Sequence, residues 1–393
     1  MNKIKKLLTL TALVLIGTAV SAQDVRTLET KVADLLARMP ADNLALASRL
    51  MEDMYALGDE GRAMICEQIV PAGKGDDLRA RYAVASLTAH LSKDSDDTRK
   101  RAWESQCIQF MKSAGDREVR SFFMRQLSLT GSDMAVTALS DYVSSPEICD
   151  DAVIVLQSIG SKAAASLLYS SLSEVECPCA AQVMVALAAT HPGSATDIYM
   201  KRYLGGNDAE KAAALLAIAS TGAPEAYDIL VDAARAASFR RDPGGAVRAL
   251  LLYAKIIGLN GEVKKMERIV NQVIDVSRDQ EAASQRLAAM SIITGVKGSD
   301  ALGMLLEAAD DPDVAIRGGA LRLAAGMPGS DVTKKWINRY ARVSDVAKPE
   351  ILFMLGERGD ELAVPLMMKA LDDPSPEISA GAVAALARLQ GVR

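Results

Sequence analysis

The sequence contains few aromatic residues and only two histidines, although half of its 393 residues are hydrophobic. Phe, Tyr and Trp together make up 4% of the chain, so Ala, Leu, Val and Met must fill its core. Small aliphatic side chains suit helices that pack closely, because bulky rings would hold the helix axes apart. The alternation of apolar and polar residues that indicates a strand does not persist over any long stretch. These absences favour an all-helical protein.

Long apolar runs are also missing after the N-terminus. Residues 1–22 have the features of a signal peptide: Lys3, Lys5 and Lys6, then an apolar stretch over 7–20, then Val-Ser-Ala at 20–22. That stretch is shorter than the roughly 20 residues of a membrane-spanning helix. We therefore expect cleavage after Ala22 and a mature protein without a membrane span in a periplasmic or extracellular space.

Positive charge is not in excess either. The formal net charge is −5, and removal of the three signal-peptide lysines makes the mature chain more acidic. Nucleic-acid-binding proteins usually have a basic surface. The charge therefore argues against a nucleic-acid partner.

The most informative feature present is a block of about thirty residues that recurs along the chain. The clearest copies begin at Asp311 and Asp373, and weaker copies begin at Asp116, Pro146, Pro178, Asp208, Asp242 and Asp279. Each copy is predicted to be a helix pair, and we call the second helix of a pair the inner helix. The pairs are predicted to end near Gly160, His191, Gly222, Gly258, Gly295, Gly326, Gly356 and Gly391, because glycine terminates helices well.

Helices are predicted before the array and at its beginning. Their expected ranges are 24–39, 43–57, 61–70, 78–91, 97–114 and 117–129. Residues 23–71 form the predicted N-terminal helices or cap, and 72–393 the repeat array. The glycine-rich loop at 72–76 lacks the Gly-Lys-Ser/Thr ending and the preceding strand of a phosphate-binding loop.

The segment Asp-Pro-Asp-Val-Ala-Ile-Arg at 311–317, followed by Ala320 and Leu321, resembles a HEAT repeat of the short kind also found in phycobilisome lyases. The resemblance covers roughly 61–391. It implies an armadillo-like, right-handed α-solenoid of about ten stacked helix pairs. Solenoids of this kind usually provide extended binding surfaces. The lyases handle a bilin chromophore, but no residue set in this sequence corresponds to that activity.

A polar residue recurs near the start of the inner helices. This residue is Arg120, Arg248, Arg286 or Arg317 in four of the helices, and Gln182 and Lys211 occupy comparable places in two others. The resemblance implies a ladder of these side chains along the stack. The interpretation we favour is structural: each arginine pairs with an acidic residue that opens its own or the next repeat, such as Asp116, Asp242 or Asp313.

The five cysteines allow disulfides, because an exported protein enters an oxidising compartment. Cys149 and Cys179 are one repeat apart and both open an inner helix, so we predict a disulfide between them, with Cys177 as the competing partner. Cys66 and Cys107 form a second candidate pair. The Cys-Pro-Cys sequence at 177–179 resembles a soft-metal motif of ion pumps, but two ligands make an incomplete metal site.

The middle of the array is locally basic and its repeats are longer. The basic residues are Arg235, Arg240, Arg241, Arg248, Lys255, Lys264, Lys265 and Arg268, against three acidic residues in the same segment. This reversal of charge in an acidic chain is a candidate docking site for a protein partner. The alternative is a solvated rim, since charged stretches usually only contact water.

The residue types that carry chemistry are sparse. His90 and His191 have no His, Cys or carboxylate at metal-ligand spacing, and neither lies beside a nucleophile motif. We therefore predict no catalytic, cofactor-binding or metal-binding residue and no enzymatic activity.

The last repeat has Ile378, Val383, Leu386 and Leu389 on more than one face, where a solenoid usually has a polar cap. Continuation of the natural chain beyond 393, or self-association, would cover that end. The sequence favours an exported, non-catalytic scaffold that binds a protein partner through the concave face. One alternative is the N-terminal interaction module of a longer exported carbohydrate-active enzyme, with a missing domain resembling 3-keto-disaccharide hydrolases. A weaker alternative is a lyase-like array that binds a small molecule.

Overall fold

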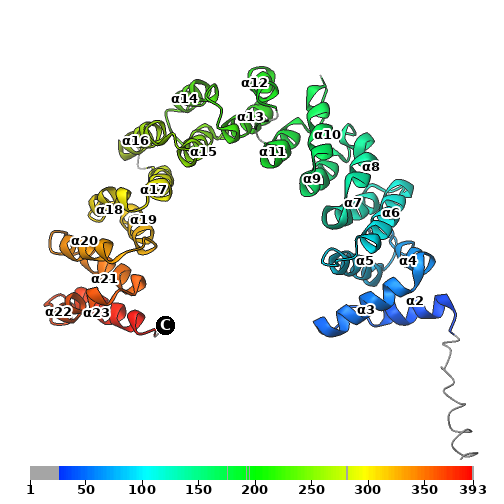
Figure 1. Cartoon of the computed structure of the whole chain (residues 1–393), viewed down its shortest axis with the longest axis horizontal. Coiled ribbons are helices and arrows are strands. Elements are labelled where there is room, and N and C mark those ends of the chain that lie inside the picture. The colour runs from blue at the N-terminus through cyan, green and yellow to red at the C-terminus, as the bar shows by residue number, and fades with distance from the viewer. Residues whose placement is uncertain (1–25, 175, 192, 194, 280–281, 392–393) are drawn as a thin grey trace, which may run out of the picture. The chain divides into compact units, whose positions relative to one another are not determined.

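The computed structural model describes residues 26–391, except 175, 192, 194 and 280–281 (Figure 1). The predicted signal peptide lies outside the described residues. Every regular element in the described ranges is a helix, and ten helix pairs follow one another from α4/α5 to α22/α23. The predicted all-α solenoid of about ten pairs is therefore confirmed. No helix in these ranges combines the length and the apolar character that crossing a membrane requires.

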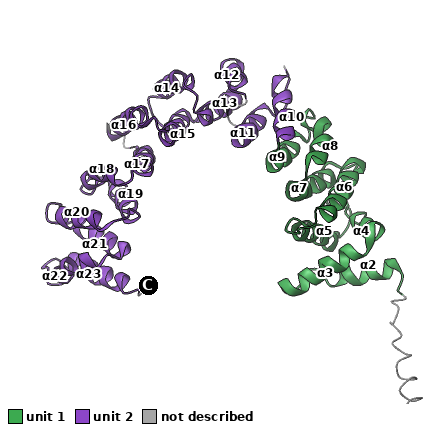
Figure 2. Cartoon of the chain, viewed as in Figure 1, with its two compact units in different colours: residues 1–161 green, residues 162–393 purple. Residues whose placement is uncertain are grey.

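The chain divides into two compact units, and the division in the sequence falls between Ser161 and Lys162 (Figure 2). Unit 1 contains α2 (Leu28–Ala37), α3 (Leu44–Ala56), α4 (Gly58–Cys66), α5 (Leu78–Leu91), α6 (Asp97–Ser113), α7 (Arg117–Thr130), α8 (Asp133–Val143) and α9 (Cys149–Ile159). Most of these bounds agree closely with the predicted ranges. The exception is α4, which begins and ends earlier than the predicted 61–70, because Gly58, at φ +73°, separates it from α3.

Unit 2 consists of the seven remaining pairs. Its helices are α10 (Lys162–Ser173), α11 (Ala180–Thr190), α12 (Thr196–Gly205), α13 (Asp208–Thr221), α14 (Ala226–Ala236), α15 (Ala246–Leu259), α16 (Val263–Asp279), α17 (Ala283–Lys297), α18 (Leu302–Ala308), α19 (Val314–Ala325), α20 (Ser330–Tyr340), α21 (Ala347–Arg358), α22 (Val364–Ala370) and α23 (Pro376–Leu389). Each inner helix packs on the next inner helix, from α11 to α23. This contact order is that of a helical-repeat stack.

Local sequence signals explain many helix ends. Asp116 begins α7 by accepting hydrogen bonds from the backbone amides of Glu118 (2.8 Å) and Val119 (3.1 Å). Gly160 ends α9 at φ +59° and Gly222 ends α13 at φ +63°. These left-handed conformations cost glycine little, which is why the spacing of glycines located these ends correctly.

Three other pairs end near a glycine as predicted, but the glycine lies one or two residues before the helix end. Gly258, Gly295 and Gly356 lie inside α15, α17 and α21, and Gly359 ends α21 at φ +67°. A Cβ on Gly356 would lie 2.7 Å from the carbonyl oxygen of Ala385 in α23. Glycine is needed at 356 because two inner helices approach closely there, which is a packing requirement that looks like a terminator in the sequence.

Candidate functional site

The loop between α14 and α15 has an unusual backbone. Ser238 and Phe239 have φ of +53° and +54°, a left-handed conformation that is uncommon in residues other than glycine. The Phe239 side chain is buried, and its backbone amide donates to the carbonyl of Ala234 (2.8 Å). The buried Phe239 side chain therefore anchors the start of the loop, and its packing offsets the cost of the left-handed backbone conformation.

The second half of this loop is tied to α15 and α17. The Asp242 carboxylate accepts from the backbone amide of Ala246 (3.1 Å) at the first turn of α15. In the orientation that satisfies both ends of its carboxamide, Gln285 accepts from the backbone amide of Arg241 (3.0 Å). These bonds fix the backbone that carries Arg241 between the starts of α15 and α17.

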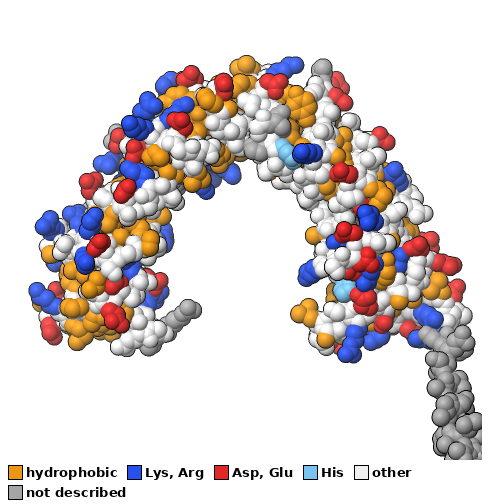
Figure 3. All heavy atoms as spheres, in the orientation of Figure 1, with side chains coloured by type: hydrophobic (Ala, Val, Ile, Leu, Met, Phe, Trp, Pro, Cys, Tyr) orange, Lys and Arg blue, Asp and Glu red, His pale blue; other side chains and the backbone are white. Residues whose placement is uncertain are grey.

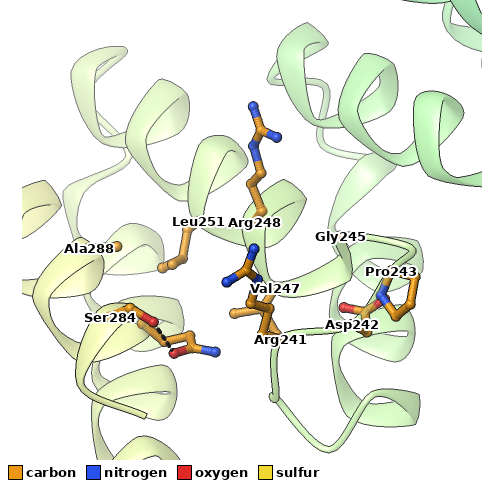
Figure 4. A pocket seen from close by; sticks show the side chains of 10 residues that line it. Arg241, Asp242, Pro243, Gly245, Val247, Arg248, Leu251, Ser284 and Ala288 are labelled. Carbon is orange, nitrogen blue, oxygen red and sulfur yellow. Dashed lines mark hydrogen bonds between the residues drawn. The ribbon is translucent and has the colours of Figure 1, made fainter.

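A hollow of about 480 Å³ lies between this loop, α15 and α17 (Figure 4). It is lined by Arg241, Asp242, Pro243, Gly245, Val247, Arg248, Leu251, Ser284, Gln285 and Ala288. Figure 4 shows the side chains of Arg241, from the loop, and Arg248, from α15, extending in the same direction. We call this part the arginine end.

A second hollow of about 530 Å³ continues along the same two helices and reaches α13. It shares Arg248, Leu251 and Ala288 with the first hollow, and the rest of its lining is Leu216, Leu252, Lys255, Leu259, Ser291, Ile292, Gly295 and Val296. We call the two hollows together the α15–α17 groove. The α17 side of the groove was not predicted from the sequence, because only the packing of successive inner helices places 284–296 opposite α15.

The basic side chains of the groove are available for a ligand. Arg241, Arg248 and Lys255 are exposed. Among the described residues, their charged groups have no hydrogen-bond or ion-pair partner. The acidic residue in the lining, Asp242, already accepts a backbone amide of α15. The groove therefore combines free positive charge with an apolar floor.

Other arginines of the predicted ladder have partners inside the fold. Arg286 donates a hydrogen bond to the Asp311 carboxylate (2.6 Å). Nε and Nη2 of Arg317 each donate to one oxygen of the Glu350 carboxylate, both at 3.0 Å. Arg317 also donates to the carbonyl of Asp311 (2.8 Å). These contacts join one inner helix to the next repeat, which agrees with a structural role for these two positions.

The predicted kind of pairing holds for Arg286, because Asp311 begins the next repeat, but the three acidic residues named as examples are not the partners. Asp116 and Asp313 accept backbone amides at the starts of α7 and α19, and Asp242 does so at the start of α15. A carboxylate that opens a repeat is used for capping because unpaired helix amides lie within its immediate reach.

The remaining ladder positions differ from one another. Arg120 donates to the carbonyl of Ala114 and lies 5.8 Å from the ring centre of Tyr142. Gln182 and Lys211 are exposed on α11 and α13. The predicted ladder is therefore not one row of equivalent groups.

The members of the predicted basic patch are spread over α14, α15, α16 and the loop between α14 and α15. Arg235 pairs with Asp232 on α14, and Lys265 lies near the hydroxyl of Tyr253 (3.4 Å) and 4.6 Å from the ring centre of Tyr227. Arg240 is an exposed loop residue, and Lys264 and Arg268 are exposed on α16. Figure 3 shows basic and acidic side chains mixed over α14 and α16. Of the predicted patch, Arg241, Arg248 and Lys255 belong to the groove.

The cysteines fall into two groups. Cys66, Cys107 and Cys177 are free thiols, and Cys149 and Cys179 are buried. The second candidate pair and the competing role of Cys177 are therefore wrong. Burial raises the pKa of Cys66 to about 12 and the pKa of Cys107 well above its ordinary value, which keeps both protonated. The bond between Cys149 and Cys179 stays a prediction, which non-reducing peptide mapping tests.

The two histidines and the last helix have local roles. His90 lies 2.7 Å from the Glu52 carboxylate, and the hydrogen bond from His90, with that from Arg99, lowers the pKa of Glu52. His191 ends α11, where its backbone amide donates to Leu187 (2.7 Å). In α23, Ile378 is buried, Leu386 and Leu389 are partly exposed and Val383 is 59% exposed.

Comparison with known proteins places the chain in no family. No family model matches it, and no curated protein matches it. One matching solved structure comes from work on a phosphorylation switch that controls the interaction between cadherin and beta-catenin. That chain is 13% identical, the match covers 91% of this chain and 94% of that one, and the TM-score is 0.33. A score this low has no bearing on function.

Proposed function

We propose that this chain is an exported, non-catalytic binding scaffold built from HEAT-like repeats, and that it holds a protein partner on the inner helices of unit 2. The observation that carries the proposal is the contrast between Arg248 and its counterparts. Arg286 and Arg317 are paired within the fold, whereas Arg248 and the adjacent Arg241 have no described partner and line a groove. Charged groups without an internal role are available for an external one.

Exposed apolar side chains along the inner helices of unit 2 support a protein partner. Inner helices of unit 2 expose large apolar side chains, namely Val185, Leu259, Val314, Phe353 and Val383. Protein-binding surfaces combine apolar contacts with arginines that lie next to them. A partner seated on the groove would cover its apolar floor and supply the anions that the arginines lack.

The chemistry-bearing residues support a non-catalytic role. His90 is tied to Glu52, and burial raises the pKa of the Cys66 and Cys107 thiols. A nucleophile needs an accessible, activated side chain with a base in reach. These residues are instead used in packing and in surface pairing.

Affinity capture from the envelope fraction of the source cells tests the proposal. The bait is the mature protein, compared with Arg241→Glu/Arg248→Glu and with the control Lys264→Glu/Arg268→Glu on α16. We expect mass spectrometry to find a partner with the unaltered protein and with the control, and to lose it with the groove variant. The same partners with all three baits would contradict a binding role for the groove.

A further inference from the structure

The α15–α17 groove is polarised along its length. The starts of both helices lie at the arginine end, where Val247 and Ser284 are part of the lining. Their ends lie at the other hollow, where Leu259 and Val296 are part of the lining. The two helices therefore run parallel, and the partial positive charge of both N-termini adds to the arginines at one end of the groove.

The other end is mainly apolar. Its lining includes Leu252, Ile292 and Val296, with Lys255 as its basic residue. A ligand that fits has its negative charge concentrated at one end and apolar groups along the rest. A nucleic-acid strand carries a phosphate at every nucleotide. In this groove, the phosphates beside the apolar hollow would lose water without gaining a partner, which argues against a nucleic-acid ligand.

The groove is partly open to solvent, which favours a polypeptide over an acyl chain. An acyl chain gains most of its binding free energy from complete removal from water, and an open groove leaves one side wet. An extended peptide keeps its outward side chains in water while alternate side chains contact the floor. Arg248 to Leu259 of α15 covers about 16 Å, which is the length of about five extended residues.

We infer that the α15–α17 groove binds an extended segment of about five residues from a partner protein, with an Asp or Glu side chain between Arg241 and Arg248 and apolar side chains over Leu252 and Ile292. This inference rests on the proposed scaffold function and specifies the partner's chemistry. The guanidinium groups donate hydrogen bonds to the carboxylate, and Arg is suited to such paired contacts.

Selection from a displayed library of random seven-residue peptides with blocked ends tests the inference directly. The target is the immobilised mature protein. We expect enriched peptides to share one acidic residue on one side of a run of apolar residues. Their binding should fall about tenfold with Arg241→Ala/Arg248→Ala, which corresponds to about 1.4 kcal/mol. Binding should also weaken as salt is raised, because part of it is electrostatic.

The control is Lys264→Ala/Arg268→Ala, which removes two exposed charges from α16 in the same unit and should leave peptide binding unchanged. A third variant, Leu252→Asn, should weaken the same peptides if the apolar floor is used. Enrichment without an acidic preference, or no enrichment over the arginine double variant, would overturn the inference.

The two proposals fail differently. If envelope capture depends on Arg241 and Arg248 but selected peptides lack an acidic residue, the scaffold function stands and the inferred partner chemistry is wrong. If neither capture nor selection depends on the two arginines, both proposals are wrong.

Discussion

The buried carboxylate of Glu104 in α6 caps the start of α8 through Ser132. It accepts from the Ser132 backbone amide (2.6 Å), from the Ser132 hydroxyl (2.9 and 3.0 Å) and from the backbone amide of Ala135 (3.0 Å). Glu104 is 0% exposed, so its carboxylate depends on these protein donors in place of water.

Glu104→Ala should therefore destabilise unit 1. The substitution leaves the buried Ala135 amide and the partly buried Ser132 amide without their acceptor and opens a cavity, which should lower the free energy of unfolding by about 2–4 kcal/mol. Urea unfolding followed by circular dichroism measures the loss. Glu60→Ala, at an exposed residue of α4 without a described partner, should change stability by less than about 0.5 kcal/mol. Equal effects of the two substitutions would contradict the capping role.

This cap shows what sequence patterns cannot locate. Many helix starts were predicted correctly because the capping residue lies one to three positions from the amides it binds, as with Asp116. Glu104 acts across 28 residues on the amide of Ser132, and in the sequence it looks like a solvated residue on a helix surface. Its role depends on how two helix pairs pack.

The candidate site was predicted in part for the same reason. A local excess of basic residues pointed to 235–268, and the repeat register placed Arg248 near the start of an inner helix. Which of these residues share a surface depends on packing. Lys264 and Arg268 are on α16, whereas Ser284 and Gln285, which carry no charge, complete the arginine end.

The contrast between paired and free arginines predicts different stabilities. Arg317→Ala should lower the free energy of unfolding by about 1–3 kcal/mol, because Arg317 is 8% exposed and its loss leaves Glu350 and the Asp311 carbonyl without their donor. Arg248→Ala should change it by less than about 0.5 kcal/mol, as at other exposed positions. Chemical unfolding of both variants measures this, and a larger cost at Arg248 would mean that it has a structural partner.

Asp77 should make part of the stability depend on pH. Burial alone would raise its pKa, but hydrogen bonds from the Val70 amide (3.0 Å) and Arg81 (2.8 Å) outweigh burial and hold the pKa below its usual range. A carboxylate with a lowered folded-state pKa stabilises the fold above its unfolded pKa, about 3.9, and this contribution is lost as pH falls through the folded pKa.

The loss of unfolding free energy caused by Asp77→Asn should therefore be largest near pH 7 and should become smaller below about pH 4. Urea midpoints at several pH values measure it. Asp42→Asn, at an exposed residue without a described partner, is the control and should change the urea midpoint little at pH 7. A difference for Asp77→Asn that is constant down to pH 2 would exclude the proposed linkage.

The free cysteines should differ in reactivity. Cys66 and Cys107 are buried and their pKa values are raised, whereas Cys177 is partly exposed. A thiol reagent at pH 8 should modify Cys177 in the native protein and all three thiols after denaturation, since the thiolate is the reactive form. Cys177→Ser should abolish the native reaction, and a native reaction that persists would place Cys66 or Cys107 within reach of solvent.

The close approach of α21 and α23 predicts that Gly356 cannot carry a side chain. A Cβ there would lie 2.7 Å from the carbonyl oxygen and 2.8 Å from the Cα of Ala385, so the backbone of α23 itself would have to move. Gly356→Ala should lower the free energy of unfolding by about 1–3 kcal/mol. Gly318→Ala in α19 has open space around its Cβ and should be neutral or stabilising by up to about 1 kcal/mol, because alanine favours the helix. Thermal unfolding of the two variants compares a packing glycine with a replaceable one, and a stabilised Gly356→Ala would show that the two inner helices can separate without cost.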